Sequence, residues 1–286
     1  MKLVRFGERG AERPGLIDAD GRVRDLSSVI ADIEPSTLSP ESLARLGTLD
    51  VSGLPVVVQD VRLGPCVGKI GKILCIGLNY RDHASETKQE LPKEPLLFMK
   101  ATSALNGPHD HVEIPRTGVQ MDYEGELAVV IGRPARYVKE ADALSFVAGY
   151  AIMDDVSERL FQKQRGGQMT KGKSGDTWAP LGPWLVTADE VPDPQKLLVR
   201  TEVDGEVRQN GTTADMVFPV AHLISYLSEF FTLYPGDIIS TGTPEGVAAG
   251  MNPPGWVQPG QTVRISITGP DGLSLGEQRS LFVKDQ

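Results

Sequence analysis

Three acidic residues of this sequence, Glu124, Glu126 and Asp155, have the type and position that a metal site requires. The first two lie in MDYEGELAVVIGR, residues 121–133, where alternation along an extended strand places Asp122, Glu124 and Glu126 on one side. The residues after them are apolar on both faces, so we expect a buried strand. Two buried carboxylates this close cannot both stay ionised without a compensating partner, which favours a divalent cation. The alternative is an amphipathic edge strand whose glutamates point into water.

Asp155 is the third carboxylate that would complete this site. It follows the apolar segment Ala143–Met153, an expected strand, and precedes VSERLFQKQ, an expected helix. Carboxylate oxygens from two strand ends, with positions left for water and substrate, suit Mg²⁺ or Mn²⁺. Arg159 and Gln162 fall on one face of that helix, and an arginine there suits an anionic substrate. An Asp-Asp pair by itself is more typical of a turn.

A candidate general base lies in ILCIGLNYRDHASE, which begins at Ile73. Ile73–Ile76 is an expected buried strand, and Tyr80–Glu86 an expected short helix. That helix would place His83 and Glu86 at i and i+3, where the carboxylate can orient the imidazole and raise its basicity. The alternative is a surface histidine beside a surface glutamate. The polar, proline-containing stretch that follows is expected to be a flap over the site.

Two lysines and a threonine are further candidates. Lys173 lies in the glycine-rich segment Gly166–Trp184, expected to be irregular, and if buried it could donate to an enolate or carboxylate oxygen. Lysines in glycine-rich loops are usually solvated, which is the alternative. Lys100 ends the apolar strand candidate LLFMK. Pro235–Thr243 is an expected strand ending in a Thr-Gly-Thr-Pro turn, whose hydroxyl and N–H groups could face the site.

The remaining histidines are weaker candidates for metal ligands. His109 and His111 form an HxH pair that could bind zinc or another transition metal, but no third ligand is evident nearby. Asp110 and the flanking prolines are typical of an exposed loop. His222 lies in Val217–Phe231, whose apolar spacing predicts a helix, and we expect it to be a helix histidine rather than a ligand.

Composition restricts the class of protein. The chain has 286 residues, 40% of them hydrophobic, and a formal net charge of −9, which would repel phosphate backbones. No apolar run approaches the roughly 18 residues that would span a bilayer. We therefore expect neither a nucleic-acid partner nor a membrane. Cys66 and Cys75 could form only one bridge, and the start of the chain has no apolar signal-peptide core, which predicts a cytoplasmic protein with reduced thiols.

The domain organisation follows from the distribution of turns. Thirty-one glycines and 21 prolines, spread along the chain, predict a strand-rich α+β fold. Glycines and a proline near residues 64–71 predict a boundary between a small N-terminal domain, 1–66, and a larger domain, 67–286. Further expected elements are a strand at Lys2–Phe6, a hairpin at Leu16–Val23 around Asp20-Gly21, a helix at Pro40–Leu46, a hairpin around Asp204-Gly205 and two short strands after Gln258.

Five segments, in order over about residues 70–250, together resemble the fumarylacetoacetate hydrolase family. They are GLNYRDHASE, DYEGELAVVIG, GYAIMDDVSERLFQ, GKSGDTWAPLGPW and LYPGDIISTGTPEGV. The resemblance implies a mixed β-roll with a barrel-like core, usually dimeric and often preceded by a small N-terminal domain. It implies that Glu124, Glu126 and Asp155 are the metal carboxylates and that His83 and Glu86 are the pair that activates water. It also implies that Lys173 is the active-site lysine and that Arg159, Gln162 and Thr243 contact the substrate. We group Lys100 with the substrate contacts.

One departure from the family narrows the resemblance. Larger members carry an additional aspartate ligand a few residues before the histidine, where this chain has Ile76. With only three carboxylates, and with Glu86 three residues after His83, the sequence resembles the smaller, acylpyruvase-type members of the family. Within it, SERLFQ followed by RGGQ is similar to hydrolases of 2,4-diketo-3-deoxy-L-fuconate and L-rhamnonate.

This resemblance implies a Mg²⁺- or Mn²⁺-dependent C–C bond hydrolase acting on a small 2,4-diketo acid. It would release pyruvate and a carboxylic acid, which is lactate for the sugar acids. The alternatives are decarboxylation or tautomerisation of oxaloacetate-like acids and isomerisation of 2-hydroxyhepta-2,4-diene-1,7-dioate. A non-catalytic ligand-binding protein that keeps the metal for stability is a further alternative. A homodimer or a higher homo-oligomer is expected.

Overall fold

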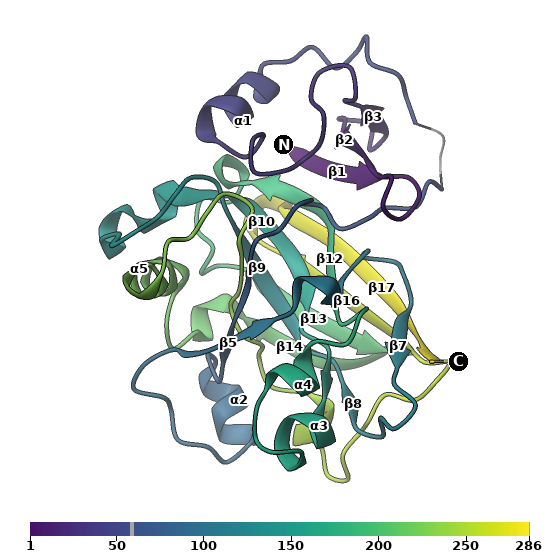
Figure 1. The fold of residues 1–286 in the computed structure, drawn as a ribbon, viewed down its shortest axis with the longest axis vertical. Helices are drawn as coiled ribbons and strands as arrows, with labels where there is room; N and C mark the ends of the chain where they lie inside the picture. The colour runs from purple at the N-terminus through teal and green to yellow at the C-terminus, as the bar shows by residue number, and fades with distance from the viewer. Residues whose placement is uncertain (58–59, 286) are drawn as a thin grey trace.

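A mixed sheet of ten strands forms the framework of the chain (Figure 1). The computed structural model describes residues 1–57 and 60–285. The strand order is β3-β2-β1-β12-β10-β9-β15-β4-β5, with β6 paired to β12. The bounds are β1 (Lys2–Phe6), β2 (Arg13–Ile17), β3 (Val23–Asp25), β4 (Ile73–Gly77), β5 (Leu96–Lys100), β6 (Leu105–Asn106), β9 (Gly125–Ile131), β10 (Val147–Asp154), β12 (Ala179–Thr187) and β15 (Ile238–Ser240).

A second sheet of five strands packs against this framework, mainly through contacts of β17 and β16 with β12 and β10. Its order is β14-β13-β16-β17-β7, and a separate two-stranded ribbon joins β11 to β8. The bounds are β7 (Val112–Ile114), β8 (Met121–Asp122), β11 (Ser157–Glu158), β13 (Leu198–Val203), β14 (Glu206–Thr212), β16 (Thr262–Thr268) and β17 (Ser274–Lys284). Within the described residues neither sheet closes into a barrel, and the strand-rich α+β class is confirmed.

Short helices connect these strands. The α-helices are α1 (Pro40–Gly47), α2 (Arg81–Glu86), α3 (Arg159–Gln164), α4 (Thr170–Lys173) and α5 (Val220–Phe230). Three-residue or longer 3₁₀ segments include η2 (Glu140–Phe146), which packs against α5, and η5 (Ala248–Gly250). No helix in the part of the chain that the structure describes is long and apolar enough to cross a membrane.

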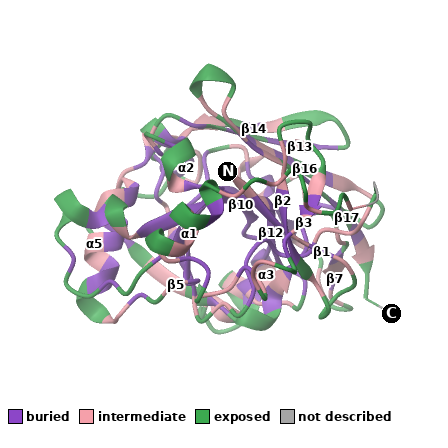
Figure 2. Ribbon diagram, turned by 90° about the horizontal axis from the view of Figure 1, so that it is seen from above, coloured by how far each residue is buried: buried purple, intermediate pink, exposed green. Residues whose placement is uncertain are grey.

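The central strand β9 is buried on both faces, as the sequence predicts. Leu127, Val129 and Ile131 belong to one hydrophobic cluster, whereas the alternate residues Ala128 and Val130 belong to another. Side chains of a strand alternate between its faces, so β9 separates two cores. Figure 2 shows the central strands as buried and the peripheral loops as exposed.

Strands β1 and β2 and the loop after β3 bury one of these faces. β1 continues the main sheet by pairing with β12, with Lys2 opposite Val186. Leu3, Leu16 and Leu26 share a cluster with Ala128 and Val130 of β9. The proposed division of the chain near residue 66 stays a prediction.

Several expected elements differ in extent from the structure. The expected continuous strand at 121–133 is two strands, β8 and β9, separated at Tyr123 and Glu124. Residues 143–146 belong to a 3₁₀ segment, so β10 starts only at Val147. The expected helix at 156–164 starts at Arg159, because Ser157 and Glu158 pair with β8 instead. At residues 157 and 158 pairing with a distant segment overrides the local helical pattern.

Other expectations concern loops and hairpins. The segment 166–184, expected to be irregular, contains α4 and most of the buried strand β12. The loop between β2 and β3 runs from Asp18 to Arg22 and is longer than the expected two-residue turn. The hairpin at Asp204-Gly205 is confirmed, since both residues have positive φ, 50° and 84°, as a type I′ turn requires. The expected short C-terminal strands are longer, and β17 spans 11 residues.

Candidate active site

The three predicted metal carboxylates meet at the ends of the central strands β9 and β10 of the main sheet. One carboxylate oxygen from each of Glu124, Glu126 and Asp155 lies within 4.8 Å of the others, and all three side chains are buried. β9 and β10 are antiparallel neighbours with Gly125 opposite Asp154, so the start of one strand lies beside the end of the other. The Asp155 N–H donates to the Glu124 carbonyl at 3.0 Å, which holds the two ends together. Within the described residues this is the only such cluster of metal-ligating side chains.

Three basic side chains contact this group. The Lys173 ammonium donates to Glu124 Oε2 at 2.6 Å and to Asp155 Oδ2 at 2.7 Å. Arg159 donates to Glu124 Oε1 at 2.5 Å and to Gln162 Oε1 at 3.1 Å, as expected for two residues on one face of a helix. Lys100 donates to Asp155 Oδ1 at 2.6 Å. Lys173 is buried, with a side chain 1% exposed, so the alternative of a solvated loop lysine is wrong.

Glu126 is the carboxylate that these cations leave without an ion pair. Its Oε2 accepts hydrogen bonds from Ser240 Oγ at 2.5 Å and from the Gly242 N–H at 2.9 Å, both neutral donors. Burial raises the pKa of Glu126 well above its ordinary value, and the charges of Asp155 and Glu124 raise it further. The pKa of Glu124 is instead held low, because Arg159 and Lys173 outweigh the effect of burial.

The charges of this buried group do not balance. Its hydrogen-bonded side chains comprise five carboxylates and three cations: Asp122, Glu124, Glu126, Asp154 and Asp155, with Lys100, Arg159 and Lys173. Asp154 Oδ2 is buried and has no hydrogen-bond partner among the residues that the structure describes, and burial raises the pKa of this carboxyl to about 7. Clustered oxygen ligands with an excess of negative charge fit a hard divalent cation such as Mg²⁺ or Mn²⁺. Glu124, Glu126 and Asp155 are the residues that would hold it.

The predicted histidine–glutamate pair forms on α2. His83 Nδ1 lies 3.3 Å from Glu86 Oε2, while Glu86 Oε1 accepts the Gly246 N–H at 3.0 Å. The carboxylate is therefore held from two sides and can orient the imidazole. His83 is only 7% exposed, so the alternative of a surface pair is wrong.

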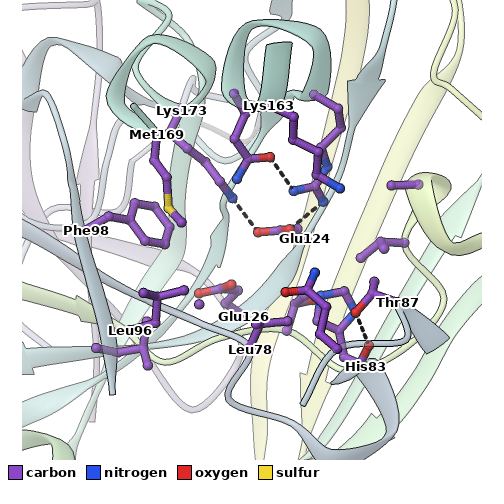
Figure 3. A pocket seen from close by; sticks show the side chains of 18 of the residues that line it. Leu78, His83, Thr87, Leu96, Phe98, Glu124, Glu126, Lys163, Met169 and Lys173 are labelled. Carbon is purple, nitrogen blue, oxygen red and sulfur yellow. Dashed lines mark hydrogen bonds and ion pairs between the residues drawn. The ribbon is translucent and has the colours of Figure 1, made fainter. Parts of the chain in front are cut away.

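A cavity of about 320 Å³ joins the pair to the acidic group. Figure 3 shows Lys173 and Met169 on one wall, His83 and Glu126 on the facing wall, and Glu124 between them. β5 contributes the apolar side chains Leu96 and Phe98. The other lining residues are Ile76, Gly77, Leu78, Thr87, Gln89, Arg159, Gln162, Lys163, Gly167, Thr243, Val247 and Ala249.

The remaining predicted site residues lie at different depths. Thr243 lines the cavity, but its hydroxyl donates to the Gly125 carbonyl at 3.0 Å and accepts from Gln209 at 2.8 Å. Lys100 is buried behind Asp155 and is not among the lining residues. His111 is exposed and its imidazole lies 3.3 Å from Glu113, and the HxH pair gains no further ligand among the described residues.

Sequence reasoning missed two residues that organise the site. Asp122 is fully buried and accepts hydrogen bonds from Arg159 Nε at 2.8 Å and from the Ala248 N–H at 2.7 Å. Gln209, on β14, accepts from the Gly125 N–H at 3.0 Å and donates to Thr243. The alternation of the 121–133 segment already placed Asp122 beside Glu124, which was the available signal. Nothing local distinguishes Gln209 from an exposed hairpin glutamine.

The comparisons with known proteins identify the family. Residues 72–281 match the C-terminal domain of fumarylacetoacetate hydrolase. A relative from Burkholderia multivorans, named only "Putative hydrolase", is 54% identical over 282 residues, which cover 98% of each chain.

Two solved structures cover the whole of this chain. Maleylpyruvate hydrolase from Sphingobium sp. SYK-6, in complex with manganese(II) ion and pyruvate, is 31% identical with a TM-score of 0.82 and is itself fully covered. The 5-carboxymethyl-2-hydroxymuconate delta-isomerase from Mycobacterium smegmatis is 32% identical with a TM-score of 0.77, again with full coverage. The chain therefore belongs to the fumarylacetoacetate hydrolase family and is an enzyme of the hydrolase or isomerase type found there.

Proposed function

We propose that this chain is a metal-dependent hydrolase that cleaves the C3–C4 bond of a 2,4-diketo acid, releasing pyruvate and a carboxylic acid. The observation that carries the proposal is the position of His83, which lines the same cavity as Glu124 and Glu126 while Glu86 orients its ring. The hydrolase name of the Burkholderia relative and the pyruvate in the Sphingobium structure support it. The sugar-derived 2,4-diketo-3-deoxy-L-fuconate and L-rhamnonate, which would yield lactate, are the first substrates to test.

His83 and Glu86 supply the base. His83 takes a proton from a water molecule, which attacks the C4 carbonyl, and the C3–C4 bond breaks with its electron pair left on C3. Protonation of C3 completes pyruvate, and the acyl half leaves as a carboxylic acid. A positioned base contributes about 10²–10⁴ in rate. A divalent cation, when bound, supplies Lewis-acid stabilisation of the negative charge that develops on the pyruvate half.

The cationic side chains position the carboxylate Glu124 and the amide of Gln162. Lys173 and Arg159 hold Glu124 from its two oxygens, which fixes the ligand geometry. Gln162, oriented by Arg159 at 3.1 Å, lines the cavity and offers its amide nitrogen to an anionic substrate. Preorganised hydrogen-bond donors of this kind stabilise the charge that develops in the transition state and do not have to reorganise during the reaction.

An isomerase is the second candidate. The solved isomerase from Mycobacterium smegmatis covers this chain over its full length. The same base could move a proton between carbon atoms of a dienol acid without activating water. The two candidates differ in whether a C–C bond breaks.

The test is pyruvate release from a panel of 2,4-diketo acids in the presence of Mg²⁺, Mn²⁺ or EDTA. We expect metal-dependent release, with the sugar-derived acids and simple acylpyruvates compared in the same assay. Variant His83→Ala should keep metal affinity and lose about 10²–10⁴ in turnover, whereas Glu124→Ala should lose both. His222→Ala, on the outer helix α5, is the matched control and should retain activity.

Three results would contradict the proposal. Activity of the Glu124→Ala protein in EDTA would show that the reaction does not need a metal. Isomerisation of a dienol acid, or carbon dioxide from oxaloacetate, without C–C hydrolysis would move the assignment to a different reaction. Thermal stabilisation by metal without turnover of any panel member would indicate a ligand-binding protein.

A further inference from the structure

Gln209 is a fully buried glutamine of β14 whose amide uses all of its hydrogen-bonding capacity within the protein. A primary amide has two N–H donors and an oxygen with two lone pairs. Here the oxygen accepts from the Gly125 N–H at 3.0 Å and from Thr201 Oγ at 2.8 Å. The nitrogen donates to Thr243 Oγ at 2.8 Å and to the Pro244 carbonyl at 2.9 Å. Because all four positions are filled, a change of this side chain affects both sides of the amide.

On one side the amide completes the hydrogen bonding of the strand that carries two of the metal carboxylates. β9 begins at Gly125, beyond the end of its pairing with β15. Side chains therefore hold the backbone of this residue. Its N–H donates to Gln209, and its carbonyl accepts from Thr243 Oγ at 3.0 Å. Gly125 lies between Glu124 and Glu126, so fixing both of its backbone polar groups fixes the direction in which the two carboxylate side chains leave the chain.

On the other side the amide holds the loop that positions the histidine base. The Pro244 carbonyl, which accepts from Gln209, is two residues before Gly246, whose N–H donates to Glu86 Oε1 at 3.0 Å. β14 packs closely against this loop, since a Cβ built on Gly246 would overlap the backbone of the strand. The Glu86 carboxylate in turn lies 3.3 Å from His83 Nδ1. One amide therefore supports both the acidic group and the histidine–glutamate pair.

We propose that Gln209 is a positioning residue that sets the separation of the metal carboxylates and couples it to the orientation of the histidine base. This inference rests on the proposed function, because it assigns Gln209 a role in that reaction. Gln209 is not among the residues that line the cavity, so it acts through Gly125 and Pro244 and not through the substrate. Its loss should weaken metal binding and turnover together, whereas a residue that serves stability alone would lower only the Tm.

Gln209→Met tests this role, because methionine keeps the length of the side chain and removes all four hydrogen bonds. We expect the Kd for Mn²⁺ to rise by about 10–100-fold, with a fall in kcat of the same order and an altered electron paramagnetic resonance spectrum of the bound ion. Gln278→Met is the matched control, since Gln278 is a buried glutamine of the same sheet that donates to backbone carbonyls and does not line the cavity. It should leave the Kd and the spectrum unchanged, whatever its effect on the Tm. Wild-type values in folded Gln209→Met, or equal changes in Gln278→Met, would overturn the inference.

Thr201→Val is a milder variant that keeps the inference testable when Gln209→Met does not fold. Valine keeps the shape of threonine and removes only the hydroxyl that donates to Gln209. The Kd for Mn²⁺ should rise severalfold, and an unchanged Kd would then overturn the inference. The Mn²⁺ measurements do not depend on turnover. If the wild type binds Mn²⁺ and the variants weaken that binding, but no 2,4-diketo acid is cleaved, the proposed function alone is overturned.

Discussion

At the scale of single residues, Asp122 connects the two halves of the site. Its carboxylate accepts from Arg159, which holds Glu124, and from the N–H groups of Ala248 and Ala249 at 2.7 and 3.2 Å. The turn that contains these alanines begins near Gly246, whose N–H holds Glu86. One buried carboxylate thus supports both the metal side and the base side. Removing its charge would leave the buried guanidinium partly uncompensated.

Asp122→Asn tests this role. The amide keeps the size of the side chain, but its NH₂ group must face donors, either the Ala248 N–H on one side or both Arg159 Nε–H and the Ala249 N–H on the other. Substitution of a residue that orients metal ligands in this way typically lowers activity or metal affinity by about 10–100-fold. We expect a loss of that order in kcat, measured together with KM and the metal dissociation constant. Asp142→Asn, in the exposed η2 segment, should be silent, and wild-type kcat in Asp122→Asn would refute the role.

At the scale of elements, the site is assembled where segments far apart in the sequence meet. The β9 start and the β10 end supply the carboxylates, α2 supplies the base, and α3 and α4 supply the cations. The 3₁₀ segment η5 then fixes α2, because Gly250 lies against the Glu86 carboxylate. A Cβ built on Gly250 would lie 2.2 Å from Glu86 Cδ, which is far inside van der Waals contact. Close approach of this helix and loop therefore requires glycine.

Gly250→Ala should displace the Glu86 carboxylate from the positions that hold His83. We expect turnover to fall by about tenfold, part of the contribution of a positioned base, with metal affinity preserved. Steady-state kinetics and a manganese titration check both parts. Gly53→Ala is the control, because a Cβ there would meet nothing within 4 Å. Equal losses of turnover and metal affinity would show a general distortion instead.

At the scale of the whole molecule, the excess of buried negative charge links stability to pH and to metal. The pKa values of Glu126 and Asp154 are raised by burial, that of Asp154 to about 7. A carboxyl with a raised pKa binds a proton in the folded protein under conditions where the unfolded chain has lost it. Stability of the metal-free protein therefore falls as pH rises from the ordinary carboxyl pKa through the raised one. A bound divalent cation opposes this loss.

We expect the Tm of metal-free protein to fall between about pH 5 and pH 8 and to recover when Mg²⁺ or Mn²⁺ is added. A cation at about 100 times its Kd adds about 2.7 kcal/mol of stability. Glu126→Gln should flatten the pH dependence and reduce the response to metal. Calorimetry in EDTA and in metal measures both. A metal-free Tm that rises over this pH range, or an unchanged metal response in Glu126→Gln, would contradict this account.

The sequence by itself determined the local parts of this protein. Alternation identified β9 as a buried strand, and helical spacing put Glu86 within reach of His83, because these patterns depend only on the geometry of one element. Residue chemistry predicted Glu124, Glu126 and Asp155 as a set of hard-cation ligands, and the resemblance pointed to the family.

The tertiary structure decided what depends on pairing and register. The alignment of Gly125 with Asp154 brings the carboxylates together, and pairing of β11 with β8 ends the expected helix early. The connecting role of Asp122 is decided by neighbours distant in the chain. Register and burial are properties of contacts between elements, which no local pattern specifies, and the charge balance of the site arises only when those contacts form.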